Sequence, residues 1–198
     1  MNSPLNLFEE KIFHFINGNH TTFLDYLMVF ASNLFLFIPI IILIAILSAW
    51  YYKHNGYYHH IAKSVMLTLV LLCGFLFCYF VLPQILPYLL DRTKPCLNPN
   101  ISNWLRLVNE DCNDVNGSFA LSPCIMFCIT SFLFFSIKDD LKKTKAFLVF
   151  LSILVSYSRI YLGAHYPGNV LLADIIGIIC GFITSRLYFY VKYDILPF

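Results

Sequence analysis

Charged residues are scarce in this sequence. Asp, Glu, Lys and Arg together make up 12% of the 198 residues, about half of the fraction that is usual in a soluble domain. Hydrophobic residues make up 59%, and the mean hydropathy is +0.72. This composition excludes a disordered chain and an ordinary soluble enzyme. The net charge of +2 and the scattered basic residues give no indication of a nucleic-acid partner.

Three other features are missing. The N-terminus has no basic start followed by a short apolar core and a small-residue cleavage site, so we expect no removable signal peptide. No internal repeat is detectable, which argues against a secondary transporter. His54, His59 and His60 have no cysteine or carboxylate nearby at ligand spacing, so a polar loop is favoured over a metal site. The sequence implies no metal and no organic cofactor.

Long apolar runs account for the high hydropathy. No charged residue lies between Asp25 and Lys53, or from 64 to 90, and about 20 apolar residues are enough for a helix to cross a bilayer. We therefore predict an all-α integral membrane protein, a bundle of five to six transmembrane helices. The predicted spans cover about residues 34–52, 64–90, 118–137, 146–162 and 168–191. Pro83 and Pro87 are expected to kink or end the second span.

Residues 1–33 have a different pattern. Apolar side chains at helical spacing alternate with the charged residues Glu9, Glu10 and Lys11. This pattern predicts an amphipathic helix that lies in the membrane interface and leads into a short sixth element. We expect residues 1–198 to form a single membrane-embedded domain.

Basic residues are unequally distributed between the two ends of the predicted spans. The positive-inside rule assigns the more basic end to the cytoplasm. The residues on that side are Lys53, Lys63, Lys138, Lys142, Lys143, Lys145, Arg186 and Lys192. The loop from Lys138 to Lys145 is best explained as a solvated inner loop, with a partner-binding patch as the alternative. We expect the protein in a bacterial inner membrane, with its site facing the periplasm or the exterior.

The seven cysteines fall into two groups. Five of them lie inside apolar runs, where cysteine behaves as a small hydrophobic residue. Cys96 and Cys112 lie instead in the polar loop between the second and third spans, on the side assigned to the exterior. In an oxidising compartment they can form a disulfide, and two free thiols are the alternative.

Three polar segments lie at the outer ends of the predicted spans, over residues 91–96, 116–123 and 157–169. Basic side chains gathered at one membrane face can bind a phosphate group, and a neutral imidazole beside them can attack it. Charge within or near an apolar run is costly, so Arg159 and Asp174 are functional candidates. A structural ion pair between the last two spans is the alternative explanation for these two residues.

The third polar segment contains Ser158-Arg159, five further residues, and then His165-Tyr166-Pro167. This run resembles a motif of the type 2 phosphatidic acid phosphatase family, which are membrane lipid phosphatases related to vanadium haloperoxidases. The family's motifs are, in order, Lys-x6-Arg-Pro, Pro-Ser-Gly-His and Ser-Arg-x5-His-x3-Asp. The three polar segments have the order and placement of these motifs. The resemblance covers the chain from about His20 to the C-terminus and is strongest in the third motif.

The resemblance implies a role for each matching residue. His165 would be the nucleophile that forms a phosphohistidine, and Arg159 would bind phosphate oxygens. Lys94-Pro95 takes the place of Arg-Pro in the first motif, with Arg92 as an additional basic group. A lysine keeps the charge but lacks the bidentate geometry of arginine. Phosphate binding is therefore expected to be weakened and not abolished.

Three positions depart from the family pattern. Pro87 stands where the first motif has its lysine. The second motif is replaced by residues 120–123, so that Pro123 occupies the position of the histidine that protonates the leaving group. Asn169 replaces the aspartate that orients the nucleophile, and an amide cannot stabilise the positive charge of the imidazole. A general acid is typically worth about 10²–10⁴-fold in rate, so alkyl phosphomonoesters are expected to be poor substrates.

Two hypotheses for function follow. The first is an integral membrane lipid phosphatase or phosphotransferase that acts on a lipid phosphate or pyrophosphate at the outer face, with membrane lipids as its surroundings. A pyrophosphate is favoured because a phosphate leaving group has little need of a general acid. A loop carboxylate from Glu110, Asp111 or Asp114 is a possible substitute acid. The second hypothesis is a catalytically inactive relative that binds lipid phosphates or serves in an envelope complex.

Overall fold

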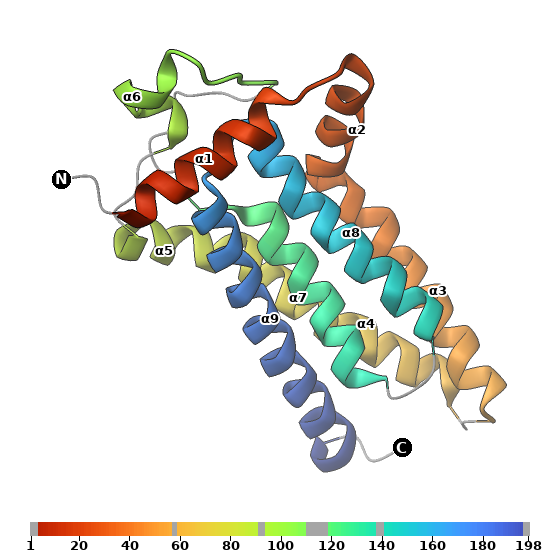
Figure 1. Ribbon diagram of the computed structural model, residues 1–198. Helices are drawn as coiled ribbons and strands as arrows, with labels where there is room; N and C mark the ends of the chain where they lie inside the picture. The colour runs from red at the N-terminus through yellow and green to blue at the C-terminus, as the bar shows by residue number, and fades with distance from the viewer. Residues whose placement is uncertain (1–3, 57–58, 91–93, 110–118, 138–140, 196–198) are drawn as a thin grey trace.

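The computed structural model of the protein describes residues 4–56, 59–90, 94–109, 119–137 and 141–195 (Figure 1). Throughout these ranges the regular structure is helical, which confirms the predicted all-α fold. α1 (Pro4–Gly18), α2 (Thr22–Ser32) and α6 (Pro99–Ser102) gather at one end of the bundle, and the C-terminus lies at the opposite end (Figure 1).

The helices between these ends form the bundle itself. In chain order they are η1 (Leu34–Leu36), α3 (Phe37–His54), α4 (His60–Leu76), η2 (Phe77–Val81), α5 (Leu82–Leu90), α7 (Leu121–Ser136), α8 (Lys142–Tyr161), α9 (Pro167–Tyr190) and η4 (Val191–Ile195). The short turn η3 (Pro95–Leu97) packs against α6. Among the described residues, four helical stretches are long and apolar enough to cross a membrane. They are Leu34–His54, His60–Leu86, Lys142–Tyr161 and Pro167–Tyr193.

α7 is the central helix of the bundle and is shorter than expected. The sequence predicts a span over residues 118–137, but α7 has 16 residues, which corresponds to a length of about 24 Å. Most of its side chains are buried against α4, α8 and α9. Because neighbouring helices surround α7, protein covers its apolar side chains where lipid would otherwise do so.

Small residues bring α9 close to α7. Gly177 and Gly181 lie one helical turn apart, the spacing that lets two membrane helices approach closely. A Cβ atom on Gly177 would lie 2.3 Å from the carbonyl oxygen of Cys124, and one on Gly181 would lie 2.4 Å from the carbonyl oxygen of Cys128. Both positions therefore require glycine because of the close approach of the two backbones.

The helix of the second predicted span passes Pro83 without ending. Proline has no N–H to donate to the carbonyl one turn earlier, which here belongs to Tyr79. The chain widens into a single π-helical turn, η2, just before Pro83 and then continues as α5 to Leu90. The expected kink therefore takes the form of a π-bulge, a recognised cause of local helix distortion.

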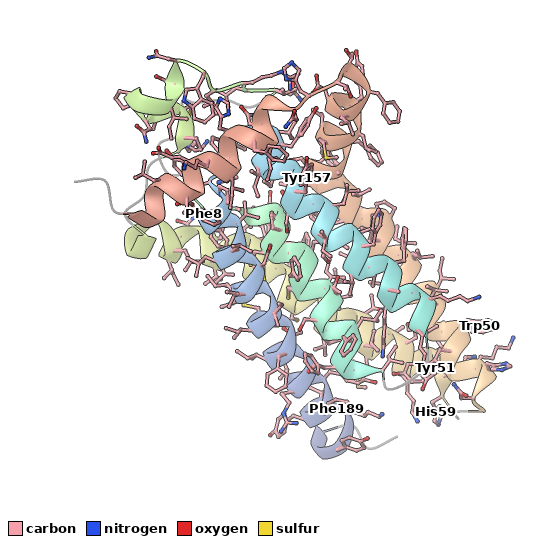
Figure 2. All side chains as sticks on the ribbon, in the orientation of Figure 1. Phe8, Trp50, Tyr51, His59, Tyr157 and Phe189 are labelled. Carbon is pink, nitrogen blue, oxygen red and sulfur yellow. The ribbon has the colours of Figure 1, made fainter. Side chains whose placement is uncertain are left out.

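Aromatic and basic side chains collect at the end of the bundle opposite α1. Figure 2 shows Trp50, Tyr51, His59 and Phe189 there. Lys192 lies over the ring of Tyr193, with 5.1 Å from its Nζ to the ring centroid. Aromatic rings and snorkelling lysines are typical of the boundary between a membrane and water.

We expect Gly177→Ala to destabilise the protein. The new methyl group would meet the backbone of α7, and overpacking of this kind typically costs about 1–3 kcal/mol. Thermal unfolding of the detergent-purified protein measures the effect as a lower midpoint. The matched control is Gly18→Ala, because a Cβ atom there meets nothing within 4 Å. A midpoint for Gly177→Ala equal to that of the wild type would contradict the close packing of α7 and α9.

Candidate active site

The turn between α8 and α9 joins the two strongest motif residues. Gly163 has a φ of +78°, and its N–H donates to the carbonyl of Ile160 at 3.1 Å. The N–H groups of Ala164 and His165 donate to the carbonyl of Arg159 at 3.1 and 3.3 Å. This is the Schellman arrangement that ends many helices, and it favours glycine at the residue with positive φ. The spacing between Arg159 and His165 therefore has a structural cause.

The side chains of Arg159 and His165 meet above this turn. Nη2 of Arg159 lies 3.3 Å from Nε2 of His165, and Nη1 donates to the hydroxyl of Ser32 at the end of α2. A guanidinium can only donate hydrogen bonds, so Nε2 must accept in this contact. The neutral imidazole then carries its proton on Nδ1 and has a lone pair on Nε2, as a nucleophile requires.

Both side chains line a cavity of about 690 Å³. Its polar lining consists of Ser32, Asn33, Gln84, Lys94, Asn109, Ser122, Arg159 and His165. Its apolar lining consists of Val29, Leu34, Phe35, Pro83, Val108, Phe119, Leu121 and Leu162. The structure thus brings Lys94 of the first polar segment together with Arg159 and His165 of the third. Two permanent positive charges and no carboxylate among the described lining residues suit this cavity to an anion.

Ser32 is a site residue that sequence reasoning missed. Besides accepting from Arg159, it receives a hydrogen bond at its carbonyl oxygen from the hydroxyl of Ser122, at 3.3 Å. Ser122 lies in the first turn of α7, within the segment that replaces the second family motif. These contacts connect α2, α7 and α8 at the cavity. A serine at the end of an apolar helix carries no sequence signal that separates it from an ordinary small residue.

The first motif segment is described in part. Lys94 precedes η3, and Pro95 begins that turn and is buried. Cys96 is disulfide-bonded. Its expected partner, Cys112, and the additional basic residue, Arg92, both lie outside the described residues, so the pairing and the role of Arg92 stay predictions.

The three positions that depart from the family pattern are close in sequence to residues that line the cavity. Pro123 is buried in the first turn of α7 and is not among the lining residues. Asn169 is buried in the first turn of α9, and its N–H donates to the carbonyl of Tyr166 at 3.0 Å. Pro87 belongs to α5, but its side chain lies outside the described residues. The orienting role of Asn169 stays a prediction.

Asp174 does not pair with Arg159. One of its carboxyl oxygens accepts a hydrogen bond from the hydroxyl of Ser156 at 2.8 Å, linking α9 to α8. The partners of Arg159 described above lie instead at the cavity end of α8. The alternative explanation from sequence, a structural ion pair between these two residues, is therefore wrong.

A polar network holds the loop at residues 106–109, part of which lines the cavity. Arg106 donates a hydrogen bond to Asp25 in an ion pair, and Tyr161 donates to the same carboxylate at 2.8 Å. The hydrogen bond from the Arg106 guanidinium holds the pKa of the Asp25 carboxyl below its usual range. Two residues further on, the N–H of Val108 donates to the carbonyl of Leu162 at 3.2 Å. Val108 and Leu162 both line the cavity.

The chain matches a known protein family over most of its length. The family model of the PAP2 superfamily matches residues 65–193, a range that includes Lys94, Arg159 and His165. The chain belongs to the PAP2 superfamily. This membership confirms the resemblance inferred from the third motif.

A solved structure has a similar fold. The chain is similar to the crystal structure of Aquifex aeolicus LpxE, with a TM-score of 0.62 and 21% sequence identity. The similarity covers 93% of this chain and 97% of the other, and at this identity it establishes a common fold. No curated protein matches the chain.

We expect Ser32→Ala to weaken binding of inorganic phosphate. The variant removes the oxygen that accepts from Arg159, and a hydrogen bond with a charged group contributes about 1.5–3 kcal/mol. This range corresponds to a dissociation constant raised about 10-fold or more, measurable by calorimetry in detergent. The control is Ser185→Ala in α9, which removes a hydroxyl that donates to the carbonyl of Phe182. Equal phosphate affinity in wild type and Ser32→Ala would show that Ser32 does not orient Arg159.

Proposed function

We propose that the protein is an integral membrane lipid phosphatase or phosphotransferase that acts on a lipid phosphate or pyrophosphate. One observation carries this proposal. Lys94, Arg159 and His165 line one cavity, and Nε2 of His165 lies 3.3 Å from the Arg159 guanidinium. The Nε2 lone pair points at the guanidinium, and it becomes free to attack phosphorus once the phosphate oxygens take up the Arg159 donors.

The reaction has two steps. In the first, Nε2 of His165 attacks phosphorus and the bond from phosphorus to the leaving oxygen breaks, which gives a phosphohistidine and the released lipid portion. In the second, water attacks phosphorus, the bond to Nε2 breaks, and orthophosphate leaves. A different hydroxyl in place of water makes the same step a phosphotransfer. Arg159 and Lys94 offset the negative charge of the phosphoryl oxygens in both steps.

The departing oxygen decides which substrates react well. An alkoxide needs a proton as it leaves, and Pro123 cannot supply one. Among the described residues that line the cavity, His165 is the one histidine and no carboxylate is present. A phosphate leaving group needs far less help, so we favour lipid pyrophosphates. The substitute acids considered from the sequence, Glu110, Asp111 and Asp114, lie outside the described residues.

Asn169 is expected to slow the first step. During attack the imidazole develops positive charge, which a carboxylate at this position would stabilise and an amide does not. The analogous aspartate-to-asparagine change in the serine-protease triad costs about 10⁴-fold in rate. Losses within one catalytic unit are not additive, so the missing acid and the missing aspartate need not multiply.

We place the cavity at the outer face of a bacterial inner membrane. The end of the bundle away from α1 carries Lys142, Lys143, Arg186 and Lys192 on the helix ends, and the positive-inside rule assigns such an end to the cytoplasm. The apolar side chains that line the cavity would then contact the lipid portion of a substrate, and the cations would contact its phosphate.

The second candidate function is that of a binding protein without catalysis. Pro87, Pro123 and Asn169 each remove a group that the family pattern supplies. The two cations of the cavity remain in this case, so a lipid phosphate would still bind. Such a protein would hold its ligand or act within an envelope complex.

Phosphate release by detergent-purified protein tests the proposal. We expect release from lipid pyrophosphates to exceed release from lipid monophosphates by about 10²-fold or more, the usual range for a general acid. His165→Ala should abolish release, while His20→Ala, at an exposed histidine outside the cavity, should not.

Two results would count against catalysis as proposed. Monophosphate turnover equal to or above pyrophosphate turnover would exclude the leaving-group argument. Release no greater than that of His165→Ala, with phosphate binding retained, would favour the binding protein.

A further inference from the structure

α1 contacts the segment that carries His165 along one stripe of its surface. Glu9, Phe13 and Asn17 are spaced four residues apart, so they lie on the same face of the helix. Asn17 donates to the carbonyl of Tyr161 at 2.9 Å, just before the turn. Phe13 contacts Tyr166 and Glu9 contacts Gly168, and both of these partners follow His165 in the sequence. α1 therefore holds the catalytic turn on both sides of the proposed nucleophile.

Glu9 caps the helix that follows His165. One of its carboxylate oxygens accepts a hydrogen bond from the N–H of Gly168 at 2.8 Å. Gly168 lies in the first turn of α9, where N–H groups have no acceptor within the helix. A carboxylate at this end also interacts favourably with the helix dipole. Gly168 is three residues after His165 and directly before Asn169. The backbone therefore connects the Glu9 contact to both of these residues.

Phe13 fixes the residue next to His165. Its side chain is fully buried, and its ring centroid lies 5.7 Å from that of Tyr166 and 5.9 Å from that of Trp104. The hydroxyl of Tyr166 in turn accepts from Asn98 at 3.1 Å. Asn98 directly follows η3, the turn after Lys94. The segments that carry Lys94 and His165 thus meet against α1.

The opposite side of α1 is apolar and exposed. Phe8 and Phe15 are 65% and 70% exposed, and Figure 2 labels Phe8 on α1. The placement of this helix in the membrane interface stays a prediction. α1 is therefore attached to the catalytic turn by one face and leaves the other exposed.

We propose that Glu9 is a positioning residue for His165. By capping α9, it keeps the turn in the geometry in which Nε2 of His165 faces Arg159 and the cavity. This inference rests on the proposed function, because it assigns Glu9 a part in the reaction at His165. Glu9 itself is not a lining residue of the cavity, so its effect on chemistry would pass through the backbone of Gly168.

The test compares three variants of the full-length protein in detergent. Glu9→Met keeps the length of the side chain and removes the acceptor, Glu9→Gln keeps an oxygen acceptor, and Glu10→Met is the matched control on the neighbouring carboxylate. Two readouts are used: kcat and KM for release of phosphate from a lipid pyrophosphate, and the rate at which diethyl pyrocarbonate modifies His165, followed by mass spectrometry.

We expect Glu9→Met to lower kcat by about 10-fold to 100-fold, because misplacing a reacting group by about 1 Å can have that effect. KM should change little, since Arg159 and Lys94 still bind the phosphate. His165, which is buried in the wild type, should be modified several-fold faster. Glu9→Gln should restore most of kcat, and Glu10→Met should match the wild type in both readouts.

The two readouts separate this inference from the proposed function. If the wild type releases no more phosphate than His165→Ala, the proposed function fails, and the modification rate alone decides the role of Glu9. An unchanged rate in Glu9→Met then overturns the positioning role. With an active wild type, equal kcat in Glu9→Met, or equal losses in Glu9→Met and Glu10→Met, overturns it as well.

Discussion

The partners of the Arg159 guanidinium set the geometry of the whole site. A permanent charge at the end of an apolar helix must be surrounded by polar groups, and this side chain donates to Ser32 and lies against Nε2 of His165. Its own carbonyl accepts the N–H groups of the turn that follows. These contacts of one residue connect the end of α2 to the turn after α8 and determine which nitrogen of His165 faces the guanidinium.

The chemistry follows from what surrounds this pair. The cavity offers positive charge from Lys94 and Arg159 and places His165, the proposed nucleophile, beside them, and its described lining residues include no acid to protonate a departing alkoxide. Such a site binds phosphate and transfers it best when the leaving group is weakly basic. The tight contact of α7 with α9 supports this geometry, because both helices begin at the cavity end of the bundle.

Sequence reasoning reached the parts of the protein that local pattern encodes. Apolar runs predicted the membrane helices, and the resemblance of the third segment to a family motif predicted Arg159 and His165, which one turn joins. Ser32 and Glu9 could not be found in this way, since they lie 127 and 159 residues from the partners they bind. The burial of α7 and the separation of Asp174 from Arg159 also depend on how the helices pack. Hydropathy carries no information on either point.

The most direct test of the account is to trap the covalent intermediate. Purified protein is mixed with a lipid pyrophosphate, quenched in alkali, in which phosphohistidine is stable, and digested for mass spectrometry. The account predicts a phosphoryl group on His165 in the wild type and none on that peptide in His165→Ala. Phosphate release without a phosphorylated His165, or a phosphoryl group on a different residue, would contradict it.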